Sequence, residues 1–163
     1  MPLYLKYSFI FNLVLMTSFS LYVGSASAFC FNDAGARYNI DPVLLRSISI
    51  RESSLNPNAI NSNKNKDGKI TSYDYGLMQV NSSHLEKLKS LGVIKDKKDL
   101  LTNPCLNVQI GAWILATHIQ KCGVNWDCLG SYNAGFAGDR ASIRMDYARK
   151  VYKIYSKELN GRR

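Results

Sequence analysis

Two pairs of residues in this chain each combine a helix-capping side chain with a proline: Asp41-Pro42 and Asn103-Pro104. Aspartate and asparagine satisfy free backbone N–H groups at the start of a helix, and proline suits the first helical turn. The first pair predicts a helix that ends before Asn56-Pro57. The second predicts a long apolar helix through Leu106 to Ile119, ended by Gly123. The chain must therefore fold mainly as helices.

The remaining patterns add two helices and one stretch of strand. Ser82 or Ser83 is expected to cap a helix that ends at Gly92, and Ala141 to Leu159 carries apolar residues at helical spacing. Only Lys69 to Val80 has the composition of strand. The 163 residues leave room for one domain with a core. We predict an α+β domain, mostly helical, with a small β-hairpin after its first strong helix.

Residues 1–28 are predicted to be a secretory signal peptide whose removal leaves Phe29 as the first residue. Lys6 is the only charged side chain in this segment, an apolar stretch follows it, and Ala26-Ser27-Ala28 resembles a cleavage site. Residues 29–163 would then form the domain, with the last few residues disordered. A lasting membrane anchor is the alternative, but serine and glycine break the apolar run before the roughly 20 residues that span a bilayer.

Export gives the four cysteines a structural meaning, because an oxidising compartment favours disulfides. Cys122 and Cys128 flank a short predicted turn and can meet easily, which leaves Cys30 to pair with Cys105 at the start of a later helix. The second pair would tie the first helix to the core. A zinc site is the competing reading, and it is disfavoured because the two histidines have no compact ligand spacing with the cysteines.

The charge predicts a polyanionic partner. The formal net charge is +9, and removing Lys6 with the signal leaves +8. The basic residues are scattered, and an exported protein rarely meets DNA, so nucleic acid is not expected. A bacterial wall or an anionic membrane surface fits export better, and the alternative is that the charge only keeps the chain soluble.

Glu52 is the strongest candidate for chemistry. It lies four residues after Ile48 and seven after Leu45, so its carboxyl should emerge from the apolar face of the first strong helix. Apolar neighbours disfavour the charged form, which would raise the pKa of Glu52 and suit it to act as a general acid. A surface glutamate paired with Arg46 or Arg51 is the alternative, and position alone does not decide between the two.

Three short motifs carry a family resemblance. Glu52-Ser53, Gly76-Leu77-Met78-Gln79 and Ser131-Tyr132-Asn133-Ala134-Gly135 occur in the order and at about the spacing of the soluble lytic transglycosylases. These are lysozyme-like enzymes that cut peptidoglycan glycan strands, and the resemblance covers Cys30 to Tyr155. The chain's size and its start at Cys30 resemble the small members that accompany type III and type IV secretion systems or conjugative pili. A lysozyme-like fold is therefore expected.

The resemblance also implies roles for individual residues. Glu52 would be the catalytic acid, with no metal or other cofactor. It would protonate the glycosidic oxygen between N-acetylmuramic acid and N-acetylglucosamine, then take the proton of the muramoyl 6-hydroxyl as that oxygen closes a 1,6-anhydro ring. Tyr147 resembles the tyrosine that approaches the catalytic carboxyl. The implied substrate-binding residues are Ser53, Met78, Gln79, Tyr132, Asn133 and Tyr147.

Asp74 departs from this family's usual pattern of a single catalytic carboxylate. The segment Asp74 to Ser82 resembles animal-type lysozymes, in which an aspartate two residues before the glycine is the partner carboxylate. We therefore expect Asp74 to face the positive charge that develops on the sugar, as a nucleophile, an electrostatic stabiliser or a bystander. The product would accordingly carry only 1,6-anhydromuramoyl ends, or a mixture of these ends and the reducing ends that hydrolysis leaves.

The stretch from Asn63 to Asp74 has a second reading as a calcium loop, since oxygen-bearing side chains follow the spacing of an EF-hand. Three lysines in this stretch oppose a dication, and Asp67-Gly68 suits the turn of a hairpin. We predict a hairpin that brings Asp74 toward Glu52.

These expectations combine into a monomeric peptidoglycan lytic transglycosylase of the periplasm. It would act on glycan strands and open the wall locally for a secretion or pilus apparatus. Two alternatives stay open: a lysozyme-type hydrolase that uses Asp74 and water, and a non-catalytic wall-binding subunit of a secretion system.

Overall fold

A computed structural model describes residues 29–161 of the chain. The predicted signal peptide, residues 1–28, lies outside the described residues, and so do residues 162–163, on which the expected disordered end falls. The elements in chain order are α1 (Phe31–Tyr38), α2 (Pro42–Ser53), β1 (Ile60–Lys64), β2 (Ile70–Tyr75), β3 (Val80–Asn81), the 3-10 helix η1 (Ser82–His84), α3 (Leu85–Ser90), α4 (Asp99–Thr102), α5 (Pro104–Cys122), α6 (Trp126–Ala134), the 3-10 helix η2 (Gly138–Arg140) and α7 (Ala141–Asn160). The predicted α+β class, mostly helical with a small sheet, is confirmed.

Both predicted helix starts are confirmed at atomic level. The Asp41 side chain accepts a hydrogen bond from the Val43 N–H at 2.8 Å, and Asn103 accepts one from the Leu106 N–H at 3.0 Å. Gly123 ends α5 with a φ of 85°. The serine cap predicted for the next helix is wrong, because Asn81 provides the cap and the helix opens with the 3-10 turn η1.

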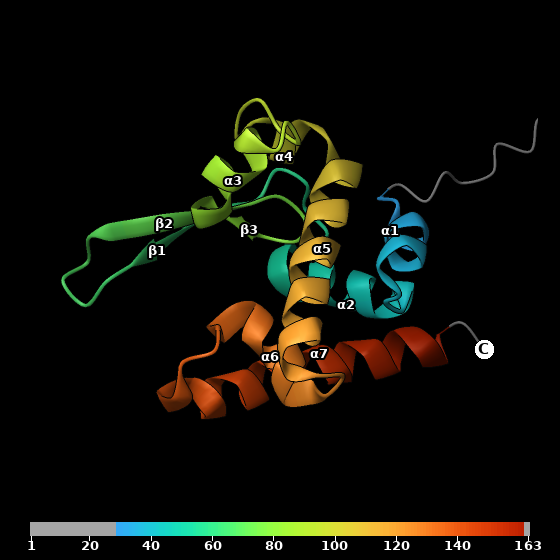
Figure 1. Cartoon of the computed structure of the whole chain (residues 1–163). Coiled ribbons are helices and arrows are strands. Elements are labelled where there is room, and N and C mark those ends of the chain that lie inside the picture. The colour runs from blue at the N-terminus through green and yellow to red at the C-terminus, as the bar shows by residue number, and fades with distance from the viewer. Residues whose placement is uncertain (1–28, 162–163) are drawn as a thin grey trace, which may run out of the picture.

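The sheet has three antiparallel strands in the order β1-β2-β3. The β1–β2 hairpin extends away from the helical body (Figure 1), so the hairpin reading of Asn63 to Asp74 is confirmed. The predicted strand from Lys69 to Val80 is interrupted by a turn. Gly76 and Gln79 have φ angles of 74° and 49°, a backbone conformation that ends β2 and starts the short β3.

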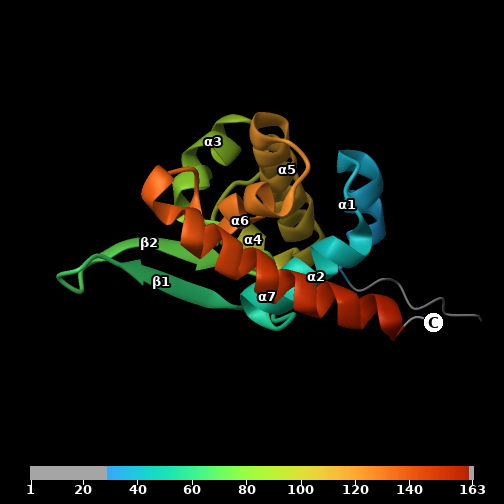
Figure 2. The same cartoon turned by 90° about the horizontal axis from the view of Figure 1, so that it is seen from below.

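The core consists of two apolar clusters that share helix α5. One cluster joins α5 to α1, α2 and α7, and the other joins it to the end of the sheet and α3. In the view of Figure 2, α7 runs across the underside of the molecule beside α2. Within residues 29–161, no helix is both long and apolar enough to cross a membrane.

The two predicted disulfides are present. Cys30–Cys105, with 5.2 Å between Cα atoms, joins the start of α1 to the start of α5. Cys122–Cys128, with 5.6 Å between Cα atoms, joins the end of α5 to the first turn of α6.

Candidate active site

Glu52 lies in the last turn of α2 and emerges from the apolar core, as its spacing predicted. Leu45 and Ile48, on the same helix, are fully buried, whereas Glu52 is half-buried. The Tyr147 hydroxyl of α7 donates a hydrogen bond of 2.5 Å to Oε1 of Glu52. Within residues 29–161, Oε2 of Glu52 has no hydrogen-bond partner. One carboxyl oxygen is thus fixed, and the other is available to carry a proton.

Burial is the main influence on this carboxyl. It raises the pKa of Glu52 above its ordinary value, while the Tyr147 hydrogen bond and the charge of Arg51 lower it and the charge of Asp74 raises it further. Burial, followed by the charge of Glu52, also raises the pKa of Tyr147 well above its usual range, so that the hydroxyl keeps its proton and donates. Arg46 pairs with Glu158 at 2.7 Å instead of with Glu52. The geometry therefore favours Glu52 as a general acid over Glu52 as one partner of a surface ion pair.

Asp74 is held by two amides on the neighbouring strands. Asn81 of β3 donates to its Oδ1 at 2.6 Å, and Asn63 of β1 donates to its Oδ2 at 2.7 Å. Both amides also donate to the Ser72 hydroxyl oxygen, at 3.1 and 3.0 Å. These cross-strand bonds fix the orientation of the Asp74 carboxyl on one face of the sheet.

A polar cleft of about 490 Å³ contains both acids. The strands form one wall, α6 with the following turn η2 forms the other, and the end of α2 supplies Glu52. The lining residues are Glu52, Asn63, Lys64, Thr71, Ser72, Asp74, Gln79, Asn81, Tyr132, Asn133 and Arg140. The cleft therefore brings together five residues predicted from the sequence, namely Glu52, Asp74, Gln79, Tyr132 and Asn133.

Three predicted substrate-binding residues lie behind the cleft instead of lining it. Met78 is fully buried, with its side chain against Gly111, so the expectation that it lines the cleft is wrong. The Ser53 hydroxyl bonds to the carbonyls of Ser49 and Leu77, at 3.1 and 2.9 Å, and so ties α2 to the turn after β2. Tyr147 is 3% exposed and reaches Glu52 from the core side. These residues support the site from behind the cleft.

The polar groups of Gln79 and Tyr132 are also occupied. The Gln79 amide donates to the Gly76 carbonyl at 2.8 Å and accepts from Asn61 at 2.7 Å, which stabilises its left-handed backbone conformation. The Tyr132 hydroxyl donates to the Met78 carbonyl at 2.8 Å. Burial, followed by the charges of Glu52 and Asp74, raises the pKa of Tyr132 well above its usual range, so the hydroxyl keeps its proton and donates a hydrogen bond to the Met78 carbonyl.

Asn107 of α5 is a positioning residue that sequence reasoning missed. It is fully buried, and its Oδ1 accepts from the Met78 N–H at 2.8 Å. Its Nδ2 donates to the carbonyls of Tyr75 and Leu100, at 2.8 and 3.0 Å. A Cβ added at Gly76 would lie 2.3 Å from this amide. The turn that carries Gln79 is thus built against one asparagine. In the sequence, the signal that could have revealed Asn107 was a polar residue within the apolar pattern of a predicted helix.

Comparison with known proteins decides the family. The model of the transglycosylase SLT domain matches residues 29–155. The chain belongs to this family. A peptidoglycan-binding-like protein of Escherichia coli O157:H7 is 47% identical over 161 residues, which cover 97% of this chain and 94% of that protein. Invasion protein IagB of Salmonella typhimurium is 40% identical over 137 residues, which cover 84% of this chain and 81% of that protein.

A solved structure shows the same fold as this SLT domain. It is an inactive mutant of the lytic transglycosylase Slt from Pseudomonas aeruginosa, with a TM-score of 0.57 and 18% sequence identity. The match covers 83% of this chain and 24% of the Slt chain. The expected lysozyme-like fold, typical of lytic transglycosylases, is therefore confirmed.

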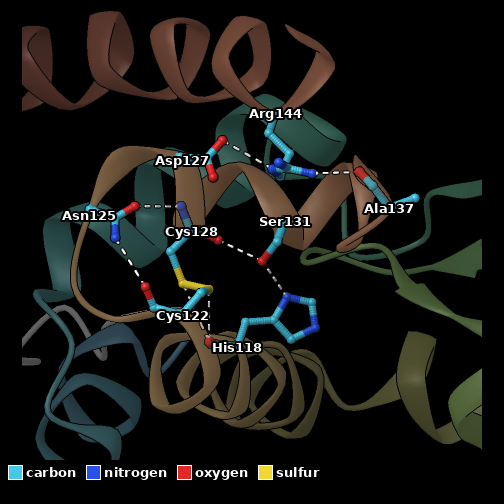
Figure 3. Close-up of polar contacts among 8 residues, drawn as sticks. All are labelled: His118, Cys122, Asn125, Asp127, Cys128, Ser131, Ala137 and Arg144. Atoms are coloured by element: carbon cyan, nitrogen blue, oxygen red, sulfur yellow. Dashed lines mark hydrogen bonds and ion pairs between the residues drawn. A yellow bond between two sulfur atoms is a disulfide. The ribbon is translucent and has the colours of Figure 1, made fainter. Parts of the chain in front are cut away.

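Helix α6 of the SLT domain carries the second cleft wall, and its start was predicted as a turn. Asn125 caps this helix by accepting from the Cys128 N–H at 2.8 Å. Figure 3 shows how the helix is fixed: Ser131 donates to the Cys128 carbonyl at 2.6 Å and lies 2.8 Å from Nδ1 of His118 on α5. Because the Ser131 proton is used, the His118 contact requires a proton on Nδ1. Arg144 adds bonds to Asp127 and to the Ala137 carbonyl.

Removing the Cys122–Cys128 disulfide is expected to weaken this wall. The double change Cys122→Ser/Cys128→Ser should lower the free energy of unfolding by about 2 kcal/mol, since the bond closes only a short loop. Urea unfolding of the oxidised wild type and the variant measures the difference. An unchanged midpoint would show that the hydrogen bonds around Ser131 hold α6 without the disulfide.

Proposed function

We propose that this SLT domain cleaves the β-1,4 bond between N-acetylmuramic acid and N-acetylglucosamine in peptidoglycan and leaves a 1,6-anhydromuramoyl end. The observation that carries the proposal is the state of Glu52. Its carboxyl lines the polar cleft, its pKa is raised by burial, and one oxygen is held by Tyr147 while the other has no partner within residues 29–161. A carboxyl of this kind holds its proton at higher pH than usual and can donate it.

The reaction needs only one carboxyl for both proton transfers. Protonated Glu52 donates to the glycosidic oxygen as the bond from that oxygen to the muramoyl C1 breaks. N-acetylglucosamine leaves with the new hydroxyl, and the Glu52 carboxylate then takes the proton of the muramoyl 6-hydroxyl, whose oxygen bonds to C1. Tyr147 keeps the carboxyl in place through Oε1. Asp74, oriented by its two asparagines, faces the positive charge that develops at C1.

We further place this activity in the periplasm, in the service of an envelope-spanning secretion apparatus. Four observations support that placement: the predicted signal peptide, the charge of +8 that follows its removal, the two disulfides, and the relative named invasion protein. The cationic chain would be retained at an anionic wall, where local cleavage opens a path through the glycan mesh.

A hydrolase is the second candidate, and the geometry of Asp74 favours it. An aspartate fixed by amides beside a half-buried glutamate is the pairing that lysozymes use, with one carboxyl as acid and the other kept ionised. In this case water would replace the 6-hydroxyl, and the product would be a reducing end.

Asp74→Asn separates these candidates. If Asp74 stabilises charge in a transglycosylase, the variant should cleave about a hundredfold more slowly and still release anhydro ends. Mass spectrometry of soluble fragments from purified wall measures both quantities. Asp67→Asn in the hairpin turn is the matched control and should cleave at the wild-type rate.

Reducing ends without anhydromuramic acid in the wild-type digest would contradict the transglycosylase proposal and favour the hydrolase. An unchanged rate in Asp74→Asn would make Asp74 a bystander.

A further inference from the structure

Two cations line the cleft, and neither forms an ion pair within residues 29–161. Lys64 ends β1 on the strand wall, and Arg140 ends η2 on the opposite wall. The carboxyls of the same cleft are already engaged, Glu52 by Tyr147 and Asp74 by two asparagines. The cations are therefore available to an anionic ligand.

A β-bulge lies beside Lys64 at this edge of the cleft. Asn63 pairs with Ser72, but Lys64 pairs with Ile70, so Thr71 is the extra residue of the bulge. Side chains of a regular strand alternate between faces, which would put Lys64 on the face opposite Asn63. Instead both line the cleft, and so do Thr71 and Ser72. Bulges occur next to active sites and redirect side chains.

Arg140 is exposed and only weakly engaged. Its Nη1 donates to the Ala134 carbonyl at 3.4 Å, at the long end of the hydrogen-bond range. By contrast, the Arg144 guanidinium contacts both Asp127 and the Ala137 carbonyl, at 3.0 and 2.8 Å. The planar Arg140 group retains the donors that suit a carboxylate.

We propose that Lys64 and Arg140 form a subsite for the carboxylates of the peptide attached to the lactyl group of muramic acid. The inference rests on the proposed function, because it takes peptidoglycan as the ligand. Where the lactyl carboxyl is amide-linked to a peptide, the sugars carry no charge and offer these cations no partner. The acidic groups of the polymer lie on its peptides. The subsite therefore selects strands whose peptides carry free carboxylates over strands in which these carboxyls are amidated.

A binding experiment tests this subsite without requiring cleavage. The full chain carrying Glu52→Gln is titrated with labelled soluble glycan strands whose peptides either keep their free carboxyls or have had them converted to amides. The quantity compared is the ratio of the two affinities at low salt. Lys64→Gln/Arg140→Gln should lower this ratio about tenfold, the effect of two partly exposed ion pairs. The control Lys66→Gln/Lys153→Gln removes the same charge outside the cleft and should keep the ratio within about twofold.

The proposal is overturned if the parent chain binds both kinds of strand equally. It is also overturned if the cleft variant loses affinity equally for both, or if the control lowers the ratio as much. Failure of the proposed function has a different signature. If the wild-type chain released no fragments from purified wall, the proposed cleavage activity would be contradicted. The ratio of the two affinities would still test the subsite, because binding does not require cleavage.

Discussion

Glu52→Gln is expected to reduce glycan cleavage about a thousandfold, because glutamine can neither donate the proton to the glycosidic oxygen nor accept one from the 6-hydroxyl. Its amide oxygen can still accept the Tyr147 hydrogen bond, so the shape of the site should be kept. Release of soluble muropeptides from purified wall measures the rate. A variant that cleaved at the wild-type rate would contradict the proposed catalytic role of Glu52.

The stability of the same variant is the control, and its pH dependence has a definite sign. Burial raises the pKa of Glu52 in the folded state above the reference value of 4.5, so the folded chain binds this proton more tightly than the unfolded chain. The resulting stabilisation is fully present below the reference value and is lost as pH rises through the raised value. Glu52→Gln should therefore unfold at a higher temperature than wild type at neutral pH, with the difference vanishing in acid. If Glu52→Gln were less stable than wild type at neutral pH, its loss of activity would be explained by misfolding.

Asn107→Leu is expected to lower the free energy of unfolding by about 4 kcal/mol, because the change leaves the Met78 N–H and the carbonyls of Tyr75 and Leu100 buried without partners. Leucine has the same branched skeleton of heavy atoms and opens no cavity, so the loss reflects the unpaired polar groups together with the larger bulk of the two methyl groups. Urea unfolding measures it. Glycan cleavage should fall as well, since the turn that carries Gln79 loses its anchor.

Asn58→Leu is the matched control, an exposed asparagine whose side chain makes no hydrogen bond within the described part of the chain. It should change the unfolding free energy by less than about 0.5 kcal/mol. Equal losses in the two variants would show that Asn107 is not the anchor of this turn.

The frame of the fold was predictable because its signals are local. Asp41 and Asn103 cap helices with their own side chains, and Gly123 ends one through its own backbone conformation. Helix α6 was missed although Asn125 is a cap of the same kind. Gly123, close before it, favoured a turn, and α6 contributes few residues to an apolar repeat. Its stability comes from contacts with α5 and α7, which lie far away in the sequence.

The site was predictable only in part, for a related reason. Glu52 sits at a spacing that fixes its direction on a helix, and Tyr147 followed from the family resemblance. The wrong expectation for Met78 arose because a motif shows which residues matter but not which way they point. Lys64 lines the cleft beside a bulge whose extra residue, Thr71, leaves no mark in the sequence. Such irregular register depends on both strands together.

The contact between Tyr147 and Glu52 also makes the candidate site depend on the last helix of the chain. The two residues are 95 positions apart, and a ribosome makes Glu52 first and the tyrosine of the last helix much later. While the chain is being made, Glu52 therefore has no group to orient it, and a fragment that stops before α7 would have the acid without its support. The last helix is therefore needed to complete the candidate site.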